Sequence, residues 1–335
     1  MTCRTMILLM TLAFGMVAMP LAAEAQPSTK VPRVGILSPQ KSTEPPTVQR
    51  EPFERGLREL GWTPGGTILI EYRYAEGEVD RLPELAADLV RLPVDVLVTR
   101  GPQATQAARQ ATRTIPIVMS ATPDPVQLGF VSSLARPTGN ITGLAFLARG
   151  SLAGKRLELL KQTVAGLARV AYLVNWHATL PDQAGTIMEE ITHAAQALGL
   201  ESQPFEVRRA QDMAEAFIAM EKAQIGGLLV DPDPHVLEPN LAQVVALALQ
   251  HRLPAIYPWR LYVDAGGLMS YATGISHFHR RSATYVDKIL KGMTPAELPV
   301  EQPTTFELVI NLKTAQALGL TIPPILLFQA DEVIR

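Results

Sequence analysis

The sequence predicts an α/β fold of two doubly wound lobes, each a parallel sheet with helices on both faces. One order of segments occurs twice: Arg33-Val-Gly-Ile-Leu-Ser38 corresponds to Arg169-Val-Ala-Tyr-Leu-Val-Asn175, and Val94-Asp-Val-Leu-Val-Thr99 corresponds to Gly226-Gly-Leu-Leu-Val-Asp231. The copies lie roughly 135 residues apart, too far for a solenoid of short repeats. Within each copy, short apolar runs alternate with residues at helical spacing, which is typical of strand-helix-strand units.

In the first half, apolar runs predict strands over 34–37, 67–72, 94–99 and 115–120. Residues at helical spacing predict one helix that ends at Gly61, one over 82–89, and helices starting at Pro102 and Pro125. A strand over 140–146 and a helix over 152–162 lead to the second copy, which occupies 170–264.

The tail beyond residue 264 is surplus to the repeat. It begins with the segment Gly266-Gly-Leu-Met-Ser-Tyr271 and then predicts a helix over 278–290, a strand-rich stretch over 300–310 and a helix over 312–318. We expect both lobes to share these elements, with 26–143 and 275–298 in one lobe and 144–274 and 299–335 in the other. The chain would then cross between the lobes three times, and without a Gly/Ser-rich spacer these crossings would act as a hinge.

The first residues differ from the rest. Arg4 precedes an apolar run over 6–21, and Ala23-Glu-Ala25 follows it, which predicts a cleaved signal peptide over 1–25 and export to the periplasm. An uncleaved membrane anchor is the alternative. The single cysteine, Cys3, falls in this segment, so the mature chain has no thiol for a disulfide or a nucleophile. The net charge of −2 gives no indication of nucleic-acid binding.

Common enzyme motifs are absent from the sequence: it contains no GxSxG, no Walker A, no GxGxxG and no HExxH. His277 and His279 lie two apart on a predicted helix, so they point to different faces and make a poor metal pair. We therefore expect a protein that is not an enzyme and that needs no metal or cofactor.

Candidate binding residues follow the predicted strands of the first half. Thr99, Gly101, Pro102 and Gln103 lead one strand into a helix whose free amides suit an anion, and Thr122 follows the next strand. The alternative for these segments is a plain tight turn between strand and helix, with no role in binding. In the second half, Asn175 and Trp176, then Asp231 and Asp233, and then Tyr257 and Trp259 follow successive strands.

These side chains allow two interpretations each. The aromatic rings suit a planar ligand but also fit partly buried surface positions. A carboxylate suits an ammonium, but either aspartate also fits an N-cap of the following helix.

The sequence resembles the substrate-binding proteins of ATP-binding-cassette transporters with the type I periplasmic-binding fold, in the branch that includes tryptophan-type amino-acid binders. The likeness covers essentially the whole mature length. It is carried by Phe53-Glu-Arg-Gly-Leu-Arg-Glu-Leu-Gly61, Ile115-Pro-Ile-Val118 with Asp124-Pro125, Asn140-Ile-Thr-Gly143, Gly154-Lys-Arg-Leu-Glu-Leu-Leu160, Gly266-Gly-Leu-Met-Ser-Tyr271 and Leu308-Val-Ile-Asn-Leu-Lys-Thr-Ala315.

The resemblance implies a ligand between the lobes that touches residues near Ser38, Thr99 to Gln103, Thr122, Asn175, Asp233 and Tyr257, with Asp233 facing the cleft. The chain departs from the amino-acid binders at Ser38-Pro39-Gln40-Lys41, where they tend to carry a His-Pro element. The implied ligand is thus either amino-acid-like or an aromatic or carboxylated organic molecule.

The resemblance further implies an exported, monomeric capture protein that delivers its ligand to an ABC permease in the inner membrane. Two other functions stay open at this point. The same closure could report a ligand to a receptor kinase or chemoreceptor, and an exported hydrolase or isomerase would need a general base beside a bound substrate.

Overall fold

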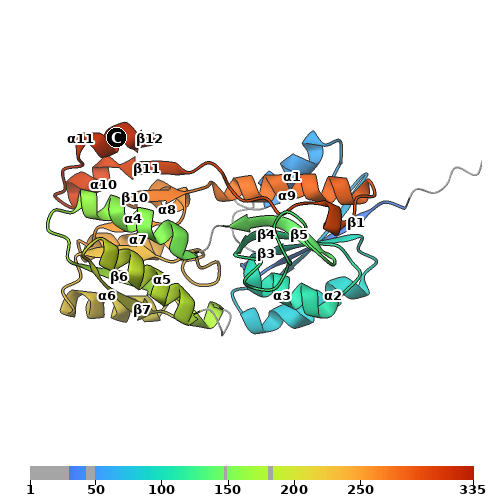
Figure 1. Cartoon of the computed structure of the whole chain (residues 1–335), viewed down its shortest axis with the longest axis horizontal. Helices are drawn as coiled ribbons and strands as arrows, with labels where there is room; N and C mark the ends of the chain where they lie inside the picture. The colour runs from blue at the N-terminus through green and yellow to red at the C-terminus, as the bar shows by residue number, and fades with distance from the viewer. Residues whose placement is uncertain (1–29, 43–49, 147–148, 180–183) are drawn as a thin grey trace, which may run out of the picture. The chain divides into compact units, whose positions relative to one another are not determined.

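Two sheets with helices on both faces make up the computed structural model of the chain (Figure 1). The structure describes residues 30–42, 50–146, 149–179 and 184–335. The predicted signal peptide lies outside the described residues. Both sheets belong to one unit, Pro32–Arg335.

The first sheet is parallel throughout and has the strand order β2-β1-β3-β4-β5. Its strands are β1 Arg33–Ser38, β2 Leu69–Tyr74, β3 Val96–Arg100, β4 Ile117–Pro123 and β5 Ile141–Phe146. Its helices are α1 Arg50–Glu59, α2 Leu82–Arg91, α3 Gly101–Ala111 and, from far along the chain, α9 Ile275–Leu290. Figure 1 shows α9 lying beside α1 in this lobe.

The period of two along each strand divides the core of this lobe into two layers. On β3, Val96 and Val98 face α1 and α9, where Leu57 and Val286 are buried, whereas Leu97 faces α2 and α3. All three of these β3 side chains are buried, as is usual for a parallel strand covered on both faces.

The second sheet has the order β12-β11-β10-β9-β8-β6-β7. Its strands are β6 Arg169–Val174, β7 Glu201–Glu206, β8 Gly227–Val230, β9 Ala255–Tyr257, β10 Met269–Ala272, β11 Glu307–Asn311 and β12 Glu332–Ile334. One face is covered by α4 Arg149–Thr163, α5 Ala184–Ala197, α10 Leu312–Ala317 and α11 Pro324–Gln329, and the other by α6 Asp212–Lys222, α7 Leu241–Gln250 and α8 Arg260–Asp264.

The prediction of two parallel-sheet lobes is confirmed, with one local exception. The strand β11 runs antiparallel to β10. The reason is its route: β10 runs on into α9 of the first lobe, and β11 follows the segment that pairs there through Glu301 and Leu144. Because the chain re-enters the second sheet from the end where β10 leaves it, β11 must run in the opposite direction.

The helix predicted from Pro125 is wrong, because the segment consists of turns. Asp124 Oδ1 accepts the N–H of Gln127 at 3.1 Å, and the N–H groups of Phe130 and Val131 both turn back to the carbonyl of Pro125. These bonds complete the turn locally, so the backbone does not propagate a helix. Among the described residues, none of the helices has the length and apolarity needed to span a bilayer.

Candidate functional site

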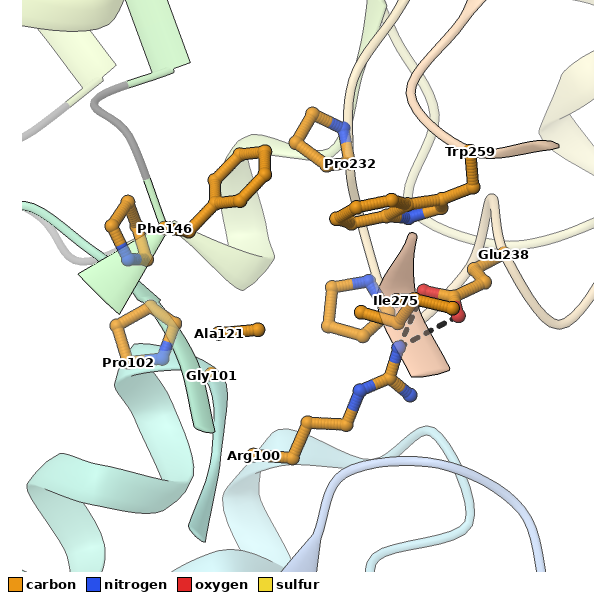
Figure 2. A pocket seen from close by; sticks show the side chains of 11 residues that line it. Arg100, Gly101, Pro102, Ala121, Phe146, Pro232, Glu238, Trp259 and Ile275 are labelled. Carbon is orange, nitrogen blue, oxygen red and sulfur yellow. Dashed lines mark hydrogen bonds and ion pairs between the residues drawn. The ribbon is translucent and has the colours of Figure 1, made fainter. Parts of the chain in front are cut away.

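A small pocket lies where strands of both sheets end (Figure 2). The first lobe contributes residues from the ends of β3, β4 and β5, from the turn after β3 and from the start of α9, and the second contributes residues that follow β8 and β9. The lining residues are Arg100, Gly101, Pro102, Ala121, Pro123, Phe146, Pro232, Pro234, Glu238, Trp259 and Ile275. Its cavity volume of about 30 Å³ has room for a water molecule or two, so a larger ligand requires the lobes to part.

The turn after β3 is built to bring Arg100 to the pocket. Gly101 has a φ of +73°, a conformation that residues with a Cβ rarely adopt, and Pro102 lies in the first turn of α3. The Thr105 hydroxyl donates to the Gly101 carbonyl at 2.8 Å and lies 2.9 Å from the Thr99 hydroxyl. Thr122 joins the same buried cluster at 3.3 Å from Thr105, so both predicted threonines brace the turn from behind.

The opposite wall of the pocket depends on Asp233. Its Oδ1 accepts the N–H of His235 at 3.1 Å, and its Oδ2 accepts those of Val236 and Leu237 at 2.8 and 2.9 Å. The Asp233 carbonyl also accepts the N–H of Glu238 at 3.0 Å. Asp233 therefore shapes the loop that presents Glu238, while Asp231 accepts the hydroxyl of Tyr172.

An ion pair from one lobe to the other closes one side of the pocket. Arg100 Nη2 donates to both carboxylate oxygens of Glu238 at 2.6 and 2.8 Å (Figure 2). Gln40, which follows β1, donates to Glu238 Oε1 at 3.3 Å. Arg100 and Glu238 are only 5% and 6% exposed, so both charges have lost nearly all of their water. Both of these Glu238 side-chain partners lie in the first lobe.

Aromatic and aliphatic side chains form the rest of the pocket. Trp259 lies with its ring centre 5.3 Å from that of Phe146, and Ile275 completes the surface (Figure 2). The Trp259 Nε1 is buried and has no hydrogen-bond partner among the described residues. Such a donor is costly unless something accepts its hydrogen bond. The pocket thus offers an apolar wall, an unpaired donor and two opposite charges.

A second cavity lies on the first-lobe side of Arg100. Its lining includes Phe53, Tyr72, Ser120 and His279 as well as Arg100, and its volume is about 20 Å³. His279 Nδ1 lies 3.5 Å from the Ser120 hydroxyl. Burial lowers the pKa of His279 well below its usual value, and the positive charge of Arg100 lowers it further, so the imidazole is neutral.

The other predicted residues are not part of the pocket lining. Ser38 is buried at the end of β1, and Asn175 is buried directly after β6. Trp176 is half-buried with its edge against Tyr172, their ring centres 5.9 Å apart, and Tyr257 is buried in a stack on Tyr262. Gln103 lies in the first turn of α3, and its buried Nε2 has no partner among the described residues.

Besides the strand-end aromatic Trp259, the pocket contains side chains that the sequence does not indicate as binding residues. Arg100 lies within the turn from Thr99 to Gln103. Phe146 ends a predicted strand. Glu238 carries no motif, since it lies five residues beyond Asp233 and reaches the pocket through the turn that Asp233 holds. Among the described residues, no group of His, Cys, Asp and Glu lies close enough together to hold a metal ion.

Comparison with known proteins gives consistent matches over most of the chain. A family model described as ABC transporter substrate binding protein matches residues 46–334. The chain is 23% identical to the tyrosine-binding protein of Clostridioides difficile (strain R20291) over 269 residues, which cover 80% of this chain and 75% of that protein.

Two solved structures resemble this one closely. One is the ABC domain in complex with L-Trp from Streptococcus pneumonia, with a TM-score of 0.80 and 26% identity over 90% of this chain and 99% of that one. The other is a conserved domain protein from Vibrio cholerae O1 biovar El Tor, with a TM-score of 0.81 and 26% identity over 91% of this chain and 100% of that one.

Proposed function

We propose, because the chain belongs to the ABC transporter substrate-binding protein family, that it captures a small organic molecule between its lobes and delivers it to an ABC permease in the inner membrane. The proposed ligand is amino-acid-like or an aromatic or carboxylated molecule. The observation that carries this proposal is the pocket itself, in which an apolar wall of Phe146 and Trp259 adjoins the buried charges of Arg100 and Glu238.

The chemistry of the pocket supports binding rather than turnover. Arg100 is held by Glu238, and the neutral His279 lies behind Arg100, on the side of the second cavity. The relatives support a ligand of the same class, since one is named for tyrosine and another holds L-Trp. We further propose that the chain is cleaved before Gln26, is released to the periplasm and acts as a monomer. One lobe would consist of 26–143 with 275–298 and the other of 144–274 with 299–335, and the two would rotate about three crossings.

Native mass spectrometry of freshly purified protein tests this function. A ligand bound with submicromolar or tighter affinity stays on the protein at the concentrations used for native mass spectrometry, so we expect one small molecule per chain, released on collisional activation. Protein that is empty on isolation is then offered amino acids, aromatic acids and other small solutes. Failure of every solute to bind would contradict the proposal, and conversion of a bound solute would indicate an enzyme.

A further inference from the structure

The buried ion pair between Arg100 and Glu238 carries an inference about what the pocket recognises. Two charges buried together pay a large desolvation cost, which their mutual attraction offsets only while both are present. Here the partners come from different lobes, so opening the lobes returns both to water and removes this constraint. A ligand that enters must therefore either fit beside an intact pair or replace each partner.

The pocket has little room beside the intact pair. Its cavity volume of about 30 Å³ is smaller than any amino acid, and Arg100 and Glu238 fill one side of it. Arg100 also lines the second cavity, where its buried Nη1 has no partner among the described residues. The guanidinium therefore has space to turn away from Glu238 and a donor that is not yet used.

From this geometry we infer that Arg100 and Glu238 are the specificity-determining residues, and that each exchanges the other for one charge of a zwitterionic ligand. The ligand carboxylate takes the place of Glu238 on Arg100, and its ammonium takes the place of Arg100 on Glu238. A side chain then lies against Trp259 and Phe146. This inference rests on the proposed function and narrows its ligand to an α-amino acid.

Charge balance is the reason for requiring both groups. A carboxylate alone leaves two anions against one guanidinium and Glu238 buried without a counter-charge. An amine alone leaves two cations against one carboxylate, with Arg100 buried without a counter-charge. Losing one partner of a buried charge pair should weaken binding by about 30-fold or more.

The first arm of the test uses the wild-type protein only, so it does not depend on any variant folding. Calorimetry compares L-tryptophan with tryptamine, which lacks the carboxylate, and with 3-indolepropionate, which lacks the ammonium. The corresponding trios are built on L-tyrosine and L-leucine. For the side chain that binds best, both single-charge compounds should bind about 30-fold more weakly than the amino acid. Equal affinity of either one would overturn the inference.

The second arm uses Glu238→Gln and Arg100→Gln. Glu238→Gln should weaken the amino acid about 30-fold but leave the deaminated acid unchanged or tighter, because Arg100 is no longer held by Glu238. Arg100→Gln should weaken the amino acid by about the same factor but leave the decarboxylated amine unchanged or tighter, because Glu238 is no longer held by Arg100. A purely structural pair would weaken all three compounds together, and that result would overturn the inference. Glu59→Gln, which breaks the exposed pair with Arg280, is the matched control and should change nothing.

The outcomes separate the inference from the proposed function. Wild-type protein that binds uncharged solutes but none of the amino acids overturns the inference and leaves the proposed function standing. Wild-type protein that binds no small molecule overturns both.

Discussion

Arg100 and Glu238 form a buried ion pair, which is rare in proteins because removing both charges from water is costly. Well-packed apolar side chains in their place would often be as stable or more so, so the pair is poorly explained by stability alone. Asp233 explains why Glu238 can be held there, since its carboxylate fixes three backbone N–H groups of the supporting loop. Function is the better explanation for charges placed at a pocket between lobes.

His279 gives a prediction in the same neighbourhood. Because burial and Arg100 lower its pKa in the folded protein, the unfolded chain takes up this proton at a higher pH than the folded chain does. Stability is therefore lost as the pH falls below the unfolded value of 6.5, at up to about 1.4 kcal/mol per pH unit, until the lower folded pKa is reached.

Urea unfolding of wild type and His279→Gln between pH 7 and pH 5 measures this effect, with about 1.4 kcal/mol per unit as the largest slope difference expected. The wild type should lose stability relative to the variant over that window. Ser276→Ala, on the exposed face of the same helix and without a titratable group, is the control and should run parallel to the wild type. Parallel curves for His279→Gln as well would contradict a neutral buried imidazole.

At the level of elements, the edge of the first sheet depends on a close approach between β4 and β5. The register between these strands shifts between Met119 and Thr122, and Gly143 lies opposite Met119 with a φ of +131°. A Cβ on Gly143 would meet the Met119 carbonyl oxygen at 2.2 Å, a distance that no relaxed side chain accepts. This irregularity re-aims the end of β4, from which Ala121 and Pro123 reach the pocket.

Gly143→Ala should therefore lower the free energy of unfolding by at least about 3 kcal/mol, through both the backbone strain and the clash. The matched control is Gly139→Ala, because Gly139 also has a positive φ but has open space around it. That change should cost only about 1 to 2 kcal/mol, the strain alone. Chemical denaturation of both variants measures the difference, and equal losses would show that the contact with Met119 has no effect.

The sequence predicts those elements that have a local pattern of their own and fails for those that depend on distant parts of the chain. The buried parallel strands were predictable because apolar runs such as 94–99 are strong local signals. The direction of β11 was not, because it depends on which lobe the chain comes from. The sequence predicts a helix where the chain forms turns after Pro125, because Asp and Pro are common both at the start of a helix and in turns.

For the whole molecule, the internal repeat was enough to predict two lobes, and parallel-sheet rules placed the site at the strand ends. Of the predicted binding residues, Gly101, Pro102 and Trp259 line the pocket, while Thr99 and Thr122 support it from behind. Glu238 was out of reach, because no local pattern indicates that a loop held by Asp233 will bring it to Arg100 of the other lobe. A contact between lobes becomes visible only when both halves are folded.

Capture of a solute at this pocket should change the fluorescence of one of the chain's three tryptophans. Trp259 lines the pocket, Trp62 donates to Asp287 in the first lobe, and Trp176 packs against Tyr172. The solute identified by mass spectrometry is titrated into Trp259→Phe and into a Trp62→Phe, Trp176→Phe double variant. Binding at this pocket should give a saturable change in the double variant, whose only indole is Trp259, and no change in Trp259→Phe. A full signal that persists in Trp259→Phe and is absent from the double variant would show that the solute binds elsewhere.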